Sequence, residues 1–163
     1  MIIGIDPGLT GGICLLDESG VIVSYHKTPV KKDNGKTILD LKNITEIFIT
    51  AGNVVNYIIE QQHSMPQQGI SSTGKTMFNY GQLIGIIYSL AHENDYQSYS
   101  IINPQKWKNY YKKIYGESIK DKSASCALAQ KLSGKTFILP RCKKPHDGIC
   151  EAYLIAEYYR LTK

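Results

Sequence analysis

Three short apolar segments joined by tight turns open the chain, and they restrict the fold more than any later feature. Met1–Asp6 is rich in β-branched residues and stops at the turn sequence Asp-Pro-Gly. Gly12–Leu16 and Val21–Tyr25 are two further strand candidates, separated by the turn sequence Asp-Glu-Ser-Gly at residues 17–20. Strands joined by such short turns run in opposite directions, so this opening predicts a three-stranded antiparallel meander.

Helix and strand candidates continue along the rest of the chain. A polar loop at residues 27–35 is followed by a helix at 38–50 and a strand at 54–60. A second loop at 65–75 leads to a helix at 76–94 and a strand at 99–102. Three further helices are predicted at 104–113, 121–134 and 146–161. Asp121 or Ser123 can cap a helix that ends at Gly134. The pattern predicts an α/β fold in one domain over residues 1–163. We expect a five-stranded mixed sheet, made of the meander plus two parallel strands and flanked by helices.

Composition and hydropathy exclude several classes of protein. Hydrophobic residues make up 42% and charged residues 20% of the 163-residue chain, which is typical of a globular rather than a disordered protein. No apolar run is long enough to cross a membrane. The first residues, Met-Ile-Ile-Gly-Ile-Asp, lack the charged and apolar regions of a secretion signal. We therefore expect a cytoplasmic protein without a membrane partner.

Positive charge is concentrated in the last third of the sequence. Residues 1–100 carry six Lys and nine acids, whereas residues 101–163 carry eleven Lys and two Arg against five acids. This asymmetry fits a surface that binds a polyanion such as DNA, and composition alone fits a solvated basic surface equally well. The residues we expect to contact DNA phosphates are Lys106, Lys108, Lys112, Lys113, Lys120, Lys122, Lys143 and Lys144.

Four acidic residues from three distant segments are candidates for one site. Asp6 closes the first strand and Glu60 closes the fourth, so parallel pairing of these strands would bring both carboxylates to one sheet edge. Asp147 and Glu151 are four residues apart near the start of the last helix and project from one face. Asp6 could also merely initiate a turn, and Asp147 could merely satisfy a helix dipole. Glu60 is more informative, because an acid that ends a Val/Ile-rich strand has no obvious structural use.

Gathering four carboxylates requires a compensating cation. Like charges repel one another, and burial without a counter-charge would protonate the acids. Oxygen ligands favour a hard divalent ion, so the expected cofactor is Mg²⁺, with Mn²⁺ as the alternative, at one or two ions per subunit. Such ions promote phosphodiester hydrolysis by activating water and stabilising the leaving oxygen. The pattern therefore indicates a metal-dependent nuclease.

The ordered motifs resemble those of RuvC-type Holliday-junction resolvases, which belong to the ribonuclease H-like superfamily. The matching segments are Gly4–Gly8 with Thr10–Gly12, Ile59–Gln61, Tyr80–Gln82 with Gly85, and His146–Ala152 with Leu154–Ala156, the last resembling phage-type members most. The resemblance covers nearly the whole chain. It implies an endonuclease that resolves branched DNA by paired nicks, leaving 5′-phosphate and 3′-hydroxyl ends, with the first-motif Asp6 and the second-motif Glu60 as metal ligands.

The resemblance also implies partners and a setting. Its members cut a four-way junction at two symmetric places as homodimers, so we expect a homodimer. The candidate interface is the helix Thr76–Asn94, where Gly81 and Gly85 would allow close backbone approach; alternatively its apolar stripe is core. The substrates would be four-way junctions, with forks and flaps also cut, in the cytoplasm of a bacterium or a phage-infected cell.

The sequence departs from the family pattern at three points. His63 stands where some members place an aromatic residue that wedges into the junction. The spacing of His146, Asp147 and Glu151 leaves the choice of metal ligands in the last motif open. The basic residues nearest the scissile phosphate are not fixed either, and the candidates are Lys112, Lys113, Lys120 and Lys122.

Other interpretations remain at this point. Gly69–Thr76 fits a nucleotide-binding loop pattern, but residues 61–68 separate it from its strand. We therefore expect no nucleotide cofactor, and assign phosphate contacts on DNA to Ser71, Ser72, Thr73 and Lys75. Asp6–Gly12 also resembles the phosphate turn of sugar kinases, which need two domains. Cys142, His146 and Cys150 have poor spacing for zinc. A ribonuclease H-like enzyme that acts on RNA or RNA–DNA hybrids, or a non-catalytic DNA-binding module, stays open.

Overall fold

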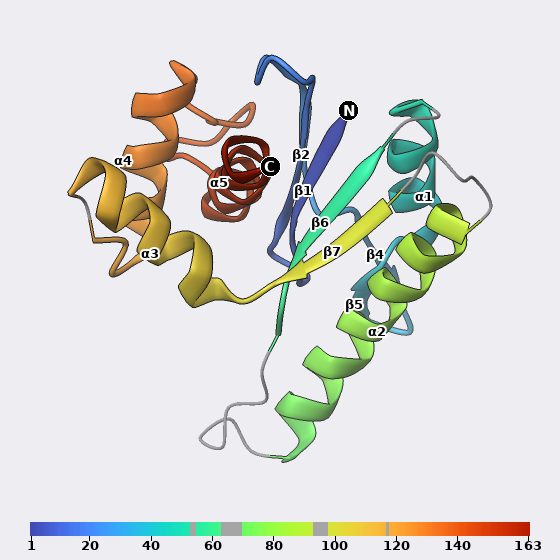
Figure 1. Ribbon diagram of the computed structural model, residues 1–163. Coiled ribbons are helices and arrows are strands. Elements are labelled where there is room, and N and C mark those ends of the chain that lie inside the picture. The colour runs from blue at the N-terminus through green and yellow to red at the C-terminus, as the bar shows by residue number, and fades with distance from the viewer. Residues whose placement is uncertain (53–54, 63–69, 93–97, 117) are drawn as a thin grey trace.

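A mixed five-stranded sheet forms the centre of the molecule. The computed structural model describes residues 1–52, 55–62, 70–92, 98–116 and 118–163, leaving aside the side chains of 70–72. The strand order is β3-β2-β1-β6-β7 (Figure 1). Antiparallel pairs join β1 (Ile2–Asp6), β2 (Gly12–Leu16) and β3 (Ile22–Lys27), whereas β6 (Asn56–Glu60) and β7 (Ser98–Ile102) add in parallel to β1. The predicted meander with two parallel strands is confirmed.

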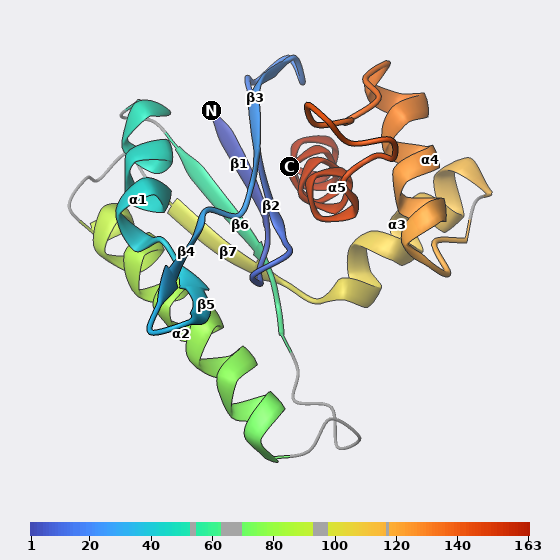
Figure 2. The same ribbon diagram turned by 180° about the vertical axis from the view of Figure 1, so that it is seen from behind.

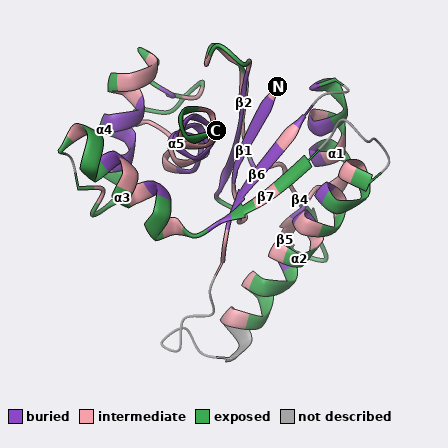
Figure 3. Ribbon diagram, viewed as in Figure 1, coloured by how far each residue is buried: buried purple, intermediate pink, exposed green. Residues whose placement is uncertain are grey.

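Helices cover both faces of this sheet. One face carries α1 (Leu41–Thr50) and α2 (Ile70–His92), and the other carries α3 (Pro104–Tyr115), α4 (Lys122–Ser133) and α5 (Asp147–Thr162), as Figures 1 and 2 show. Alternating side chains of β1 enter the two cores, Ile3 beneath α1 and α2 and Ile2 on the α5 side. Figure 3 shows the buried residues gathered along the surfaces where helices meet the sheet. No described helix is long and apolar enough to span a bilayer.

The stretch predicted as a loop after the meander is instead a β-hairpin. β4 (Val30–Asp33) pairs with β5 (Lys36–Leu39) in a separate two-stranded sheet. Asn34 and Gly35 both have positive φ, at 46° and 76°, the geometry of a tight two-residue hairpin turn. The sequence did not predict this hairpin because its strands are mostly polar. Its apolar end is the pair Val30 and Leu39, next to the rest of the molecule. The helix predicted to begin at Ile38 begins at Leu41 instead, because Ile38 belongs to β5.

The second long helix begins earlier than predicted. The Gly/Ser/Thr-rich segment was expected to be a loop as far as Lys75, but α2 starts at Ile70. Helical backbone uses its own amides in i to i−4 hydrogen bonds, so this segment does not form the phosphate-wrapping loop that nucleotide binding requires. The nucleotide-binding alternative therefore fails within the described part of this segment.

Three glycines let α5 approach the sheet closely. A Cβ on Gly4 would lie 2.1 Å from the carbonyl oxygen of Ala152, and one on Gly12 would lie 2.5 Å from the carbonyl of Gly148. Gly148 in turn forms an isolated parallel bridge with Gly11, next to the start of β2. This contact fixes the first turn of α5 against the edge of the sheet where β1 ends.

Candidate active site

The four predicted acids come together at the carboxyl end of β1. Asp6 and Glu60 are the last residues of the neighbouring parallel strands β1 and β6, whose register pairs Ile5 with Ile59. Asp147 is the first residue of α5 and Glu151 lies one turn later. The close packing of α5 on β1 and β2 holds both of them at the same sheet edge. The structure thus gathers side chains from positions as far apart as 6 and 151.

The electrostatics of Asp6 show how strongly these carboxylates affect one another. Burial raises the pKa of Asp6 well above its usual range, and the charges of Glu151, Glu60 and Asp147 raise it further, in that order. Lys122 is the one group that pulls this pKa down. A buried acid among three others is costly when ionised, so the site favours a cation or a bound proton.

Two neutral side chains hold carboxylates in place. The Nε1–H of Trp107 donates to Oε1 of Glu60 at 3.0 Å, and the Ser125 hydroxyl donates to Oε1 of Glu151 at 2.9 Å. Trp107 and Ser125 are fully buried. Their part in the site was not predicted, because each lies far along the chain from its acid. One sequence feature could have suggested these contacts. A Trp or Ser on the buried face of a helix carries a polar N–H or O–H that needs a hydrogen-bond partner.

The ammonium group of Lys122 provides a positive charge next to the acids. Its ammonium forms an ion pair with Oδ2 of Asp147. The pKa of Lys122 is raised, chiefly by its hydrogen bond to Asp147, and the charges of Glu151 and Asp6 contribute. Burial pushes the pKa of Asp147 up, but the hydrogen bond and charge of Lys122 and two backbone N–H groups outweigh it and lower the pKa. The lysine therefore lies among at least three of the four acids.

The donor set fits a hard divalent cation by its chemistry. All four groups are carboxylates, and a lysine ammonium lies where the excess negative charge requires a cation. Within the described ranges, no three His, Cys, Asp or Glu side chains converge on one point as a ready-made metal cage. Each of Glu60, Glu151 and Asp147 is hydrogen-bonded elsewhere, to Trp107, Ser125 and Lys122. Binding a metal would therefore require small side-chain rotations, and displacement of the ammonium from Asp147.

His146 and the cysteines do not extend this site. His146 is the N-cap of α5, and its Nδ1 accepts the N–H of Ile149 at 3.3 Å. Its pKa is lowered by burial first, and by the charges of Lys27 and Lys122 against the opposing pull of Asp147. Cys150 is buried in the α5 core, whereas Cys142 is exposed. The zinc alternative therefore lacks a common centre.

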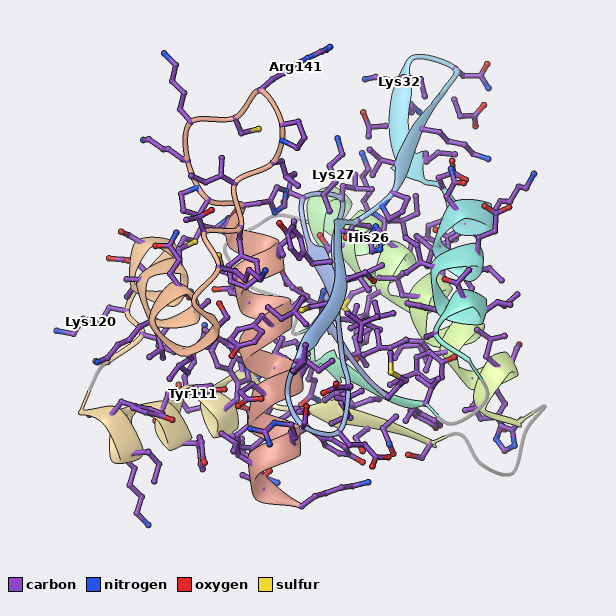
Figure 4. The ribbon with its side chains drawn as sticks, turned by 90° about the horizontal axis from the view of Figure 1, so that it is seen from above. His26, Lys27, Lys32, Tyr111, Lys120 and Arg141 are labelled. Atoms are coloured by element: carbon purple, nitrogen blue, oxygen red, sulfur yellow. The ribbon has the colours of Figure 1, made fainter. Side chains whose placement is uncertain are left out.

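The expected DNA-contacting residues lie on several elements. Lys106, Lys108, Lys112 and Lys113 are on α3, and Lys143 and Lys144 are in the segment before α5. Figure 4 shows Lys120 pointing outward between α3 and α4. Lys75 lines a hollow of about 290 Å³ with the Pro7–Thr10 turn, next to Asp6, and Thr73 is half-buried. His63 lies outside the described residues, as do the side chains of Ser71 and Ser72.

Comparison with known proteins supports the fold. No protein-family model and no curated protein sequence matches this chain. Solved structures do match. T. thermophilus RuvC in complex with a Holliday junction substrate has a TM-score of 0.59 and 15% identity, covering 99% of this chain and 96% of that chain. Another Thermus thermophilus RuvC structure has a TM-score of 0.53 and 15% identity, covering 97% and 93%.

A third match is the yeast mitochondrial Holliday junction resolvase Ydc2. It has a TM-score of 0.54 and 11% identity, and the match covers 98% of this chain and 77% of that chain. At such low identities, these matches bear on architecture alone. They agree with the strand order and helix placement described above, so the chain has a RuvC-like fold of the ribonuclease H-like type.

Proposed function

We propose that this protein is a metal-dependent endodeoxyribonuclease that cuts branched DNA, with four-way junctions as its main substrate. The observation that carries the proposal is the gathering of Asp6, Glu60, Asp147 and Glu151 around one buried carboxyl. A structural role does not explain this arrangement, because like charges at a buried site destabilise the fold. The RuvC-like fold provides the second support.

The four carboxylates would hold Mg²⁺ or Mn²⁺, which supplies an activated water and a charge partner for the leaving 3′ oxygen. Trp107 and Ser125 orient Glu60 and Glu151 and limit how far these side chains can turn. Lys122 partly offsets the negative charge of the site before substrate binds, and its side chain is long and exposed enough to reach a phosphate instead. Hydrolysis would leave 5′-phosphate and 3′-hydroxyl ends.

The preference for junctions is supported by the names of the structural neighbours, two of which are called Holliday junction proteins. Cutting a four-way junction at two symmetric places requires two active sites, so we propose a homodimer. The basic residues of α3 and of the segments flanking α4 would contact the arms of the junction, together with Lys75 beside the Pro7–Thr10 turn.

The exposed side of α2 supports such a dimer. Gly74, Phe78, Gly81, Gly85 and Tyr88 recur every three or four residues on one side of the helix. Phe78 is 66% exposed and Tyr88 is 49% exposed, and a Cβ on any of these glycines would meet nothing within 4 Å. The core-facing side is different, since it carries Leu83 and Ile87. The stripe therefore offers an apolar surface to which a second copy can pack closely.

A substrate panel tests the proposal. Purified protein with Mg²⁺ is given equal amounts of a mobile four-way junction, a fork, a flap, linear duplex DNA and an RNA–DNA hybrid. We expect paired symmetric cuts in the junction at rates far above linear duplex, with forks and flaps cut more slowly. If the RNA–DNA hybrid were cut fastest, the protein would be a nuclease with a different substrate. If the protein bound DNA but cut none of the substrates, it would be a non-catalytic DNA-binding module.

A further inference from the structure

Two rigid basic segments extend from the end of the sheet where Asp6 lies. The first is the β4–β5 hairpin, which continues directly from β3 through Thr28 and Pro29. Its lysines 31, 32 and 36 are exposed, and Lys32 Nζ donates to Thr37 Oγ1 at 2.9 Å. The two-residue turn and the paired strands define the backbone of the hairpin, and therefore the positions from which its lysines project.

The second basic segment is the loop of residues 135–145, which leads into α5. Phe137 anchors it by packing against Tyr25 and Tyr153, and His146 N–H donates to the Phe137 carbonyl. At its tip, Cys142 N–H donates to the Leu139 carbonyl and closes a turn. Arg141 occupies this turn with φ +67°, where Gly or Asn is usual. The Arg141 side chain is exposed at this tip.

A groove lies between α1 and the second segment, and Pro29 at the base of the hairpin also lines it. Its floor is the end of β3, from Tyr25 to Lys27, and its walls are α1 on one side and Leu139–Cys142 on the other. The groove holds about 680 Å³. Figure 4 shows Lys32 and Arg141 extending from the same side of the molecule, with Lys27 between them.

The charge of this surface is poorly compensated. None of Lys27, Lys31, Lys36 or the basic residues of the loop forms a salt bridge within the described part of the chain. Glu46 is the acid that lines the groove, and it pairs with Lys42 at 3.9 Å. The charge count along the sequence missed this surface, because it summed residues 1–100, where nine acids outnumber six lysines, although four of those lysines lie between positions 27 and 36.

The groove and the acid cluster lie at the same end of the sheet. Lys27 pairs in register with Gly12, and Gly12 pairs with Asp6 on the next strand. The loop ends at His146, the cap of the helix that carries Asp147 and Glu151. Two strand spacings, about 10 Å, therefore separate the groove from Asp6, a distance that a polyanion of several phosphates spans.

We propose that this groove, together with the two basic segments beside it, binds the sugar–phosphate backbone of a DNA arm that leaves the cleavage site. This inference rests on the proposed nuclease function, and it specifies the surface on which one DNA arm lies. Phosphate contacts would come from the hairpin lysines, Lys27 and Arg141, with Lys143 and Lys144 along the path.

The exposed Cys142 allows a direct test, because it lines the groove and the three other cysteines are buried. A thiol-reactive photocrosslinker is placed on Cys142 of the full-length protein, which is then bound to a labelled four-way junction without Mg²⁺. The matched control carries Cys142→Ser and Lys163→Cys, which moves the label to the opposite end of α5. We expect crosslinks from Cys142 to one arm near the cut position, and few from position 163.

Salt dependence gives a second readout. The slope of log affinity against log salt should decrease by about 1 for each phosphate that Lys31→Gln/Lys32→Gln/Lys36→Gln can no longer neutralise, while Lys163→Gln leaves the slope unchanged. If the wild type binds and cuts the junction but Cys142 does not crosslink, or the triple variant keeps the full slope, the groove proposal is overturned. If the wild type neither binds nor cuts DNA, both proposals fail together.

Discussion

Glycines lie on both sides of the central sheet, but their surroundings differ. On the α5 side, Gly4, Gly12 and Gly148 are packed so tightly that an added Cβ would come within about 2.5 Å of backbone atoms. On α2, Gly74, Gly81 and Gly85 face open space for at least 4 Å. The first group brings a helix carrying two acids onto the strand carrying Asp6. The second group lies next to exposed aromatic residues, and among the described residues an added Cβ there would meet nothing within 4 Å.

This difference separates two uses of the same residue. In the α5 contact, glycine is required for the fold itself, because the helix could not reach the sheet otherwise. In α2, glycine lowers helix stability, and no close contact among the described residues of the chain compensates for this cost. A stability cost that the monomer does not offset is consistent with a surface that packs against a second copy.

The largest effect is expected from filling the α5 contact. Gly4→Ala places a methyl group 2.1 Å from the Ala152 carbonyl oxygen and 2.8 Å from the Ala156 Cβ, so α5 must move away from β1. We expect a loss of at least about 3 kcal/mol in the free energy of unfolding, measured by urea denaturation. Nuclease activity should fall with it, because two acids move together with α5. Unchanged stability would show that the contact is loose.

The next effect concerns the hydrogen bond that orients Glu60. Trp107→Phe removes the donor at 3.0 Å while keeping an aromatic ring. We expect the Mg²⁺ concentration for half-maximal cleavage to rise about 10- to 100-fold, as for other residues that support a metal ligand.

Tyr111→Phe is the matched control for Trp107→Phe. It removes a buried hydrogen bond to the Leu154 carbonyl on the same side of the sheet, away from the acids. It should lower stability without shifting the Mg²⁺ dependence. Equal shifts in both variants would mean that packing, rather than the orientation of Glu60, is responsible.

A smaller effect of opposite sign is expected on α2. Gly81→Leu/Gly85→Leu meets no steric obstacle in the monomer and replaces two glycines with good helix formers. Monomer stability should rise by about 1 kcal/mol or more, whereas sedimentation should show dissociation of the dimer. A stabilised protein that remains dimeric would place the interface elsewhere.

The smallest effect is a pH dependence in the metal-free protein. Because the pKa of Asp6 is raised in the folded state, the folded chain binds this proton more tightly than the unfolded chain. Stability must therefore decrease as pH rises from the unfolded pKa to the folded pKa. Asp6→Asn cannot titrate, so the melting temperature of the wild type should fall relative to that of Asp6→Asn as pH rises. A difference that is independent of pH would contradict the raised pKa.

Local patterns were enough to predict the sheet and that the four acids would lie near one another, because each acid lies at a strand end or helix start that has its own sequence signal. The partners of these acids were not predictable, since Trp107 and Glu60 are 47 positions apart and no periodicity connects them. The hairpin was missed although Asn34-Gly35 is a hairpin signal, because its strands are mostly polar. The start of α2 was missed because Gly, Ser and Thr are typical of loops.

The most direct test of the acid cluster compares the thermal stability of wild type and Asp6→Asn with and without Mg²⁺. If Asp6 serves a metal site, neutralising it removes repulsion from three acids, so the metal-free variant should melt at a higher temperature than the wild type. Mg²⁺ should then raise the melting temperature of the wild type and have little effect on the variant, which should bind junctions but not cut them. A variant that is less stable than the wild type, and that keeps both its Mg²⁺ response and its cleavage, would contradict the account.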